Sequence, residues 1–197
     1  MQPIALREAL RLETREDHER TEAAFDAADI RSAAGLSFVL QAHRLALTAI
    51  RKADPAGDEL YRPSIGAIEA DLSTLSAKPF PLQSIAMSTV ALQPLGVRYV
   101  VSGSHLGARV MAKQIASSSD ARVVAANRYF GAGLGADKFQ VILQELNALP
   151  SDAKLRDALI RSAKSAFEAY RLAADLLKDW KPFETDASFA TAAARQP

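Results

Sequence analysis

Apolar residues recur every three or four positions along most of the chain, and no stretch alternates regularly between apolar and polar residues. The first pattern places apolar side chains on one face of an α-helix, whereas alternation would indicate β-strands. Prolines, glycines and short polar clusters interrupt the helical pattern. We therefore predict an all-α fold. The predicted helices cover residues 4–27, 32–52, 63–75, 82–116 with a break near Pro94, 121–130, 137–147 and 150–180.

The predicted helices form a single domain. A chain of 197 residues is long enough to bury one sizeable core, and no repeat or shift of composition marks a second domain. We expect the domain to span residues 1–181. The Ala-rich segment 182–197 is expected to be a loosely ordered tail.

Charge and composition exclude several classes of protein. The 24 basic and 23 acidic residues give a net charge of +1, which argues against a dedicated nucleic-acid binder. Because the chain has no cysteine, it cannot form disulfides, thiolate metal sites or cysteine nucleophiles. The charged N-terminal segment lacks a signal peptide's apolar run, and polar residues interrupt the longest apolar stretch, residues 85–103. We expect a cytoplasmic monomer that binds neither nucleic acid nor membrane.

The first predicted helix carries a histidine in surroundings that suit a metal-binding imidazole. Arg11, His18 and Glu22 are spaced for one helix face. Glu22 can therefore accept a hydrogen bond from the second imidazole nitrogen, which fixes the orientation of a ligating ring. The same spacing also occurs in solvated pairs on helix surfaces, so both interpretations stay open. The other histidines, His43 and His105, stand alone in the sequence.

A later helical segment contains two glycines in its interior, where each costs about 1 kcal/mol relative to alanine. Gly103 and Gly107 are four residues apart, and Tyr99 and Met111 extend the same face. A turn without side chains lets a flat molecule such as a porphyrin approach the helix backbone. It also lets two helices pack closely or marks a kink, and these alternatives stay open.

Together the two segments resemble those of bacterial heme oxygenases that form biliverdin. The resemblance extends in order and spacing over about residues 5–180. The matching motifs are Thr-Arg-Glu-Asp-His ending at His18 and followed by Glu22, and Leu-Gly-x-x-Tyr-Val-x-x-Gly-Ser-His-Leu-Gly ending at Gly107. Weaker matches are Tyr129-Phe130 with Gly133, and Ala-Lys-Ser-Ala-Phe at 163–167.

The resemblance implies a single-domain, multi-helix fold with heme between the first helix and the glycine-containing distal helix. Heme would be both cofactor and substrate, cleaved with O2 to biliverdin, CO and ferrous iron. Electrons would come from an external donor such as a ferredoxin or a flavin reductase. Alternatives are a heme carrier or sensor of the same fold without turnover, and a helical protein of related shape that acts on another substrate or serves only as an interaction scaffold.

The resemblance also implies a role for individual residues. Some family members anchor the heme propionates with basic residues at positions where this chain has Gln140 and Gln144, so Lys138, Arg128 and Lys164 are candidate substitutes. The implied site has His18 as the iron ligand and Glu22 as its partner, Gly103, Ser104 and Gly107 on the catalytic distal side, Arg11 and Tyr99 near the propionates, and Phe167 lining the pocket.

Overall fold

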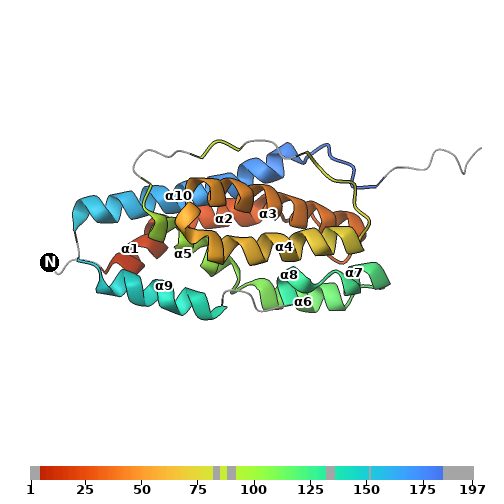
Figure 1. Cartoon of the computed structure of the whole chain (residues 1–197), viewed down its shortest axis with the longest axis horizontal. Helices are drawn as coiled ribbons and strands as arrows, with labels where there is room; N and C mark the ends of the chain where they lie inside the picture. Colours follow the sequence, from red (N-terminus) through yellow and green to blue (C-terminus); the bar gives the residue numbers. More distant parts are fainter. Residues whose placement is uncertain (1–4, 82–84, 88–91, 132–135, 151, 184–197) are drawn as a thin grey trace, which may run out of the picture.

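The computed structural model describes residues 5–81, 85–87, 92–131, 136–150 and 152–183, and these residues form helices without any strand (Figure 1). The predicted all-α class is confirmed. Gly133, which belongs to one of the weaker motif matches, and most of the predicted tail lie outside the described residues. The elements are α1 (Leu6–Glu13), α2 (Arg15–Ala23), α3 (Ala33–Ala53), the 3-10 turn η1 (Pro55–Gly57), α4 (Asp58–Thr74), α5 (Pro94–Ser104), α6 (Ala108–Ala116), α7 (Ala121–Ala125), α8 (Arg128–Gly131), α9 (Ala136–Ala148) and α10 (Ala153–Leu176).

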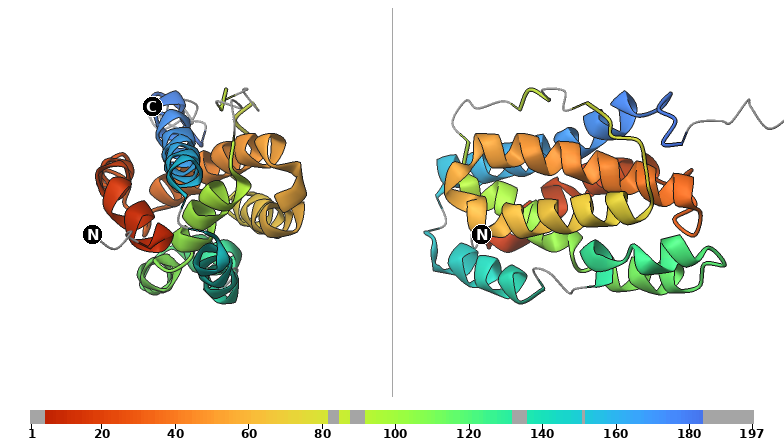
Figure 2. Two further views of the ribbon diagram at one scale, coloured as in Figure 1. Left: turned by 90° about the vertical axis from the view of Figure 1, so that its left-hand side faces the viewer. Right: turned by 45° about the vertical axis from the view of Figure 1, so that its right-hand side comes forward.

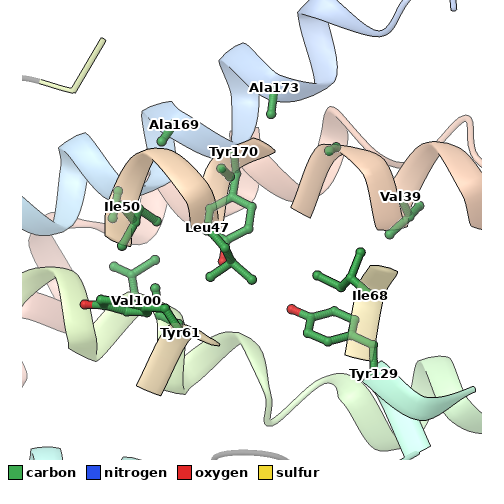
Figure 3. Close-up of a cluster of buried hydrophobic side chains, with 14 of the residues drawn as sticks. Val39, Leu47, Ile50, Tyr61, Ile68, Val100, Tyr129, Ala169, Tyr170 and Ala173 are labelled. Carbon is green, nitrogen blue, oxygen red and sulfur yellow. The ribbon is translucent and has the colours of Figure 1, made fainter. Parts of the chain in front are cut away.

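Helix α10 is the central element, because it packs against α1, α2, α3 and α5. The end-on view in Figure 2 shows it (blue) between the N-terminal helices (red) and α3 (orange). Ala163, Ala166, Ala169 and Ala173 of α10 are all buried, and their small side chains let neighbouring helices approach closely. Figure 3 shows part of the core, where side chains from α3, α4, α5 and α10 meet.

A glycine at the start of α5 makes its close approach to α10 possible. A Cβ atom on Gly96 would lie against the carbonyl oxygen of Leu159, closer than real Cβ atoms come to other atoms. We therefore expect Gly96→Ala to lower the free energy of unfolding by about 1–3 kcal/mol, measured by urea denaturation. Gly66 of α4 is the matched control, because a Cβ there would have no atom within 4 Å. Gly66→Ala should instead raise stability by up to about 1 kcal/mol, and equal effects of the two substitutions would contradict this packing.

The predicted first helix is interrupted, so the expectation of one continuous helix over 4–27 is wrong. Thr14 separates α1 from α2 with φ −107° and ψ 3°. Its buried hydroxyl donates a 2.7 Å hydrogen bond to the carbonyl of Leu10, and such bonding to the preceding turn bends helices. Residues 24–27 lie beyond α2 as turns.

The predicted helix over 82–116 is also corrected. Residues 85–87 and 92–93 are not helical, whereas residues 82–84 and 88–91 lie outside the described part. Helix α5 begins at Pro94, where the break was expected, and a turn at 105–107 separates it from α6. In that turn the amide of Leu106 bonds the carbonyl of Gly103 at 3.0 Å, a three-residue spacing that tightens and kinks a helix.

Helix α4 begins earlier than predicted, with Pro63 inside it rather than at its start. Proline has no amide hydrogen for the carbonyl one turn earlier. That carbonyl, on Glu59, instead accepts a 3.1 Å hydrogen bond from Lys138 Nζ of α9. A contact with a distant helix therefore compensates for the proline.

Two further predicted boundaries are corrected by carboxylate caps. The predicted helix over 121–130 is divided into α7 and α8, because the buried Asp71 accepts hydrogen bonds from the amides of Arg128 (3.1 Å) and Tyr129 (2.9 Å) at the start of α8. Helix α10 begins after Asp152 rather than at Pro150, since the Asp152 carboxylate accepts a 2.8 Å hydrogen bond from the amide of Leu155.

A second buried carboxylate ties α5 to α4. Asp54 accepts hydrogen bonds from Arg98 Nε (2.8 Å) and Nη2 (3.0 Å) and from the Tyr61 hydroxyl (2.7 Å). Burial alone would raise the pKa of Asp54, but the hydrogen bonds from Arg98 and Tyr61 outweigh it and hold the pKa below its usual value. These contacts fix α5, which carries Gly103 and Ser104 at its end.

Among the described residues, α3 is long and apolar enough to cross a membrane by length and composition. It packs against α4 and α10, and 56% of its most apolar window is buried inside the molecule. The core helices of globular proteins have the same length and composition.

Candidate functional site

The candidate ligand, His18, presents an accessible imidazole on α2. Its side chain is 58% exposed, and Nδ1 lies 3.4 Å from Glu22 Oε2, which is long for a hydrogen bond. The His18 ring packs nearly perpendicular to that of Phe167 of α10, with centroids 5.8 Å apart at 81°. The structure thus brings together three predicted site residues, and the position of Glu22 leaves Nε2 as the nitrogen available to a ligand.

The two glycines of the distal segment are not explained by close helix packing. A Cβ on Gly107 would meet only the Ser104 carbonyl oxygen, at 3.8 Å. A Cβ on Gly103 would meet the Phe139 ring at 3.5 Å, an ordinary contact. Gly96 differs, because a side chain there would overlap backbone. The kink expected as an alternative is present, and the turn that contains Gly107 is open to its surroundings.

Tyr99 on α5 and Arg11 on α1 were both predicted to lie near the propionates. Tyr99 is half-buried and its ring packs against Phe139 with centroids 5.6 Å apart. Burial raises the pKa of Tyr99, and the nearby positive charges of Arg7 and Arg11 partly oppose the rise. The exposed Arg7 and Arg11 of α1 thus lie within electrostatic range of the Tyr99 phenol. Arg7 was not among the predicted site residues.

Helix α10 connects the two sides of the candidate site. Phe167 and Tyr170 are three residues apart and share one helix face, separated by about 4.5 Å along the axis. Phe167 contacts His18, whereas Tyr170 packs against His43 (centroids 5.0 Å apart). The buried Tyr170 hydroxyl lies near Ser104 but is without a hydrogen-bond partner within the described chain. The Ser104 hydroxyl donates to the Val101 carbonyl at 2.8 Å.

A cluster of aromatic and imidazole rings lies behind this face, and the sequence did not reveal it. His43 Nδ1 is 2.9 Å from the Tyr129 hydroxyl. The His105 ring packs against Tyr129 with centroids 6.0 Å apart, and its Nε2 is 3.5 Å from Ser64 Oγ. Burial lowers the pKa of His43 to about 3, and the nearby His105 adds to the shift. Burial likewise lowers the pKa of His105 to about 4, together with the charge of Lys138.

These two buried histidines predict how stability depends on pH. An unfolded histidine titrates near pH 6.5, so between pH 6.5 and 4 the unfolded chain binds protons that the folded chain does not. The free energy of unfolding should therefore fall as the pH is lowered through this range, by roughly 1 kcal/mol per pH unit for each histidine. Urea denaturation between pH 4 and 8 measures the slope. His105→Gln should reduce it by about half, and an unchanged slope would contradict the buried neutral state.

The candidate propionate anchors differ in their surroundings. Lys138 bonds the Glu59 carbonyl, and Arg128 contacts Asp71 at 3.2 Å. Lys164 is 45% exposed and lies beside α2, with its Nζ 3.9 Å from Asp17. Of the three, Lys164 is the one beside the helix that carries His18.

Possible metal ligands and a surface groove also bear on the site. Within the described ranges, no group of three or more His, Asp or Glu side chains is arranged to hold a metal ion. A groove of about 410 Å³ between α1 and α10 contains none of the predicted site residues; it is lined by Ala9, Leu12, Glu13, Arg156, Asp157, Ile160 and Arg161.

Over the described residues, the fold and the site define a helical protein with an accessible imidazole on one helix and an open turn that ends in Gly107 on another. No protein-family model matches the chain, and no curated protein is significantly similar to it. Its function is therefore inferred from the chemistry of the residues described above.

Proposed function

We propose that this protein is a heme oxygenase that binds heme between α2 and the turn from Gly103 to Gly107. The observation that carries the proposal is the pairing of an accessible His18 imidazole with two helical glycines, Gly103 and Gly107, at which an added Cβ would make no close contact with the described residues. His18 contacts Phe167 of α10, and Ser104 lies near Tyr170, which shares a face of α10 with Phe167.

The residues present fit heme, which is a flat apolar macrocycle with an iron at its centre and two carboxylates at one edge. His18 would bind the iron, and Glu22 would hold the imidazole in one orientation. Phe167 offers an apolar wall. Arg7 and Arg11, whose positive charges act on Tyr99, would pair with the heme carboxylates.

Heme supplies both the iron that binds dioxygen and the ring that is opened to biliverdin, CO and ferrous iron. The chain controls access and hydrogen bonding around that chemistry. The turn at Gly103 and Gly107 permits close approach of the backbone and leaves room for a small molecule. The Tyr170 hydroxyl would hold ordered water there together with the nearby Ser104, since a buried hydroxyl normally has a hydrogen-bond partner.

Electrons would come from an external donor, a ferredoxin or a flavin reductase. The glycines that begin at Gly131 follow a helix rather than a strand, unlike a dinucleotide-binding fingerprint. We propose that the protein acts as a cytoplasmic monomer.

Titration of the purified protein with hemin tests the proposal. We expect a saturable Soret band at one heme per chain. Addition of ascorbate or a reductase system in air should then bleach this band while biliverdin and CO accumulate, as followed by absorbance and product chromatography. Absence of heme uptake would refute heme binding altogether. A Soret band that survives reduction in air would identify a heme carrier or sensor instead.

A further inference from the structure

The helix that carries His18 is held in place by polar contacts. Helices of globular proteins usually attach through an apolar stripe. Helix α2 has no apolar residue larger than alanine, and its one buried residue is Asp17. The orientation of α2 must therefore be fixed chiefly through that carboxylate.

Asp17 is the centre of a cluster of charged groups, and Arg171 of α10 makes the most extensive contacts with it. Arg171 Nη2 lies 3.2 Å from Asp17 Oδ1, and Nη1 donates to the Asp17 backbone carbonyl (3.2 Å) and to the Thr21 hydroxyl (3.1 Å). Arg20 Nη2 also reaches the carboxylate at 3.0 Å, and Lys164 Nζ lies 3.9 Å away. A planar guanidinium that bridges side chain and backbone fixes both partners in one arrangement.

This cluster lies beside the candidate ligand. Asp17 and His18 are consecutive residues, which places their side chains about 100° apart around α2. Phe167 and Arg171 are four residues apart and share a face of α10. Helix α10 therefore contacts α2 at two neighbouring points, of which one is the His18 ring and the other is the Asp17 carboxylate.

We propose that Arg171 is a positioning residue, which through Asp17 fixes the rotation of α2 and so directs the His18 imidazole toward its ligand. This role rests on the proposed heme site, and it adds a determinant of that site outside the set implied by the resemblance. A buried ion pair contributes little net stability relative to apolar residues of the same size, but it can select one geometry. Asp17 is 7% exposed and Arg171 23%, so the pair is shielded enough to do so.

The first test needs no heme. In the free protein, the Phe167 ring, 5.8 Å from the His18 ring and nearly perpendicular to it, is expected to shift the NMR signals of the His18 ring protons. We expect Arg171→Met to move these signals toward those of an unconstrained histidine. Arg156→Met is the matched control on the same helix, because the Arg156 guanidinium pairs with its neighbour Asp157, and it should leave the signals unchanged. Unchanged His18 signals in Arg171→Met would overturn the proposal.

Two further variants separate orientation from charge and from folding. Arg171→Lys keeps the positive charge but cannot make the bridging contacts, so we expect it to resemble Arg171→Met; wild-type signals in this variant would overturn the positioning role. Asp17→Asn retains the size of the side chain and removes the charge. It should give the same displaced signals while circular dichroism reports a folded helical protein.

The heme complex provides the second readout. Loss of groups that orient a metal ligand typically lowers metal affinity about 10- to 100-fold, and we expect this loss of hemin affinity in Arg171→Met, with an altered spin-state spectrum. Hemin affinity and spin state like the wild type's would overturn the proposal. If the wild-type protein fails to bind hemin, the proposed function fails, while the His18 signals still decide whether Arg171 orients that ring.

Discussion

Replacing His18 by alanine is expected to abolish heme cleavage while leaving the fold intact. Loss of a supporting group beside a metal ligand typically lowers activity 10- to 100-fold, so loss of the ligand itself should reduce turnover at least about 100-fold. The side chain is 58% exposed, so the free energy of unfolding should change by only about 0.5 kcal/mol. Biliverdin formation and thermal denaturation of the same preparation measure both effects.

Glu19→Ala is the control for His18→Ala. Glu19 is exposed on the same helix, and its partner is Arg15 at 2.9 Å. This variant should turn over heme at the wild-type rate. Normal biliverdin formation by His18→Ala would remove the imidazole from the mechanism, and loss of activity in both variants would point to damage of α2.

Gly107→Leu should weaken heme binding about 10- to 100-fold without destabilising the free protein. The Cβ position is open, so a larger side chain has room when heme is absent. With heme bound against the turn, the leucine side chain would occupy space that heme needs. Such overpacking typically costs about 1–3 kcal/mol, which corresponds to a loss of affinity of about 10- to 100-fold. Hemin titration and urea denaturation give the two quantities.

Gly66→Leu is the matched control for this substitution. Gly66 is another helical glycine with open space at its Cβ position, but it lies in α4 and was not predicted to contact heme. Hemin affinity should be unchanged in this variant. Equal affinities of Gly107→Leu and the wild type would show that the open turn is an ordinary surface feature.

Apolar periodicity predicted the helical class and most helices, but not the interruptions that depend on distant contacts. The early start of α4 depends on Lys138, which donates a hydrogen bond to the Glu59 carbonyl that Pro63 leaves without an amide partner. The division between α7 and α8 depends on Asp71, which is 57 positions away from Arg128. The sequence around a helix boundary does not identify such distant partners. Nor does the sequence show which amides a buried carboxylate of another helix will cap.

The candidate site was predictable where its signals are local. The spacing of His18 and Glu22, and that of the two distal glycines, put each pair on one turn of chain. The contact of Phe167 with His18 followed only from the family resemblance. The His43–Tyr129 pair spans 86 positions and the Asp17–Arg171 pair 154, and neither has a motif that could have identified it.

The polar attachment of α2 also determines where the molecule opens most easily. Detaching α2 breaks the polar contacts of Asp17 with Arg171 and Lys164 of α10 and exposes little apolar surface, whereas detaching α3 would expose the core. Regions with few buried apolar contacts have the lowest free energies of local opening, so backbone amides of α2 should exchange with deuterium earlier than those of α3. If heme binds beside His18, the helix that carries the imidazole is therefore the element that can most easily move aside to admit it.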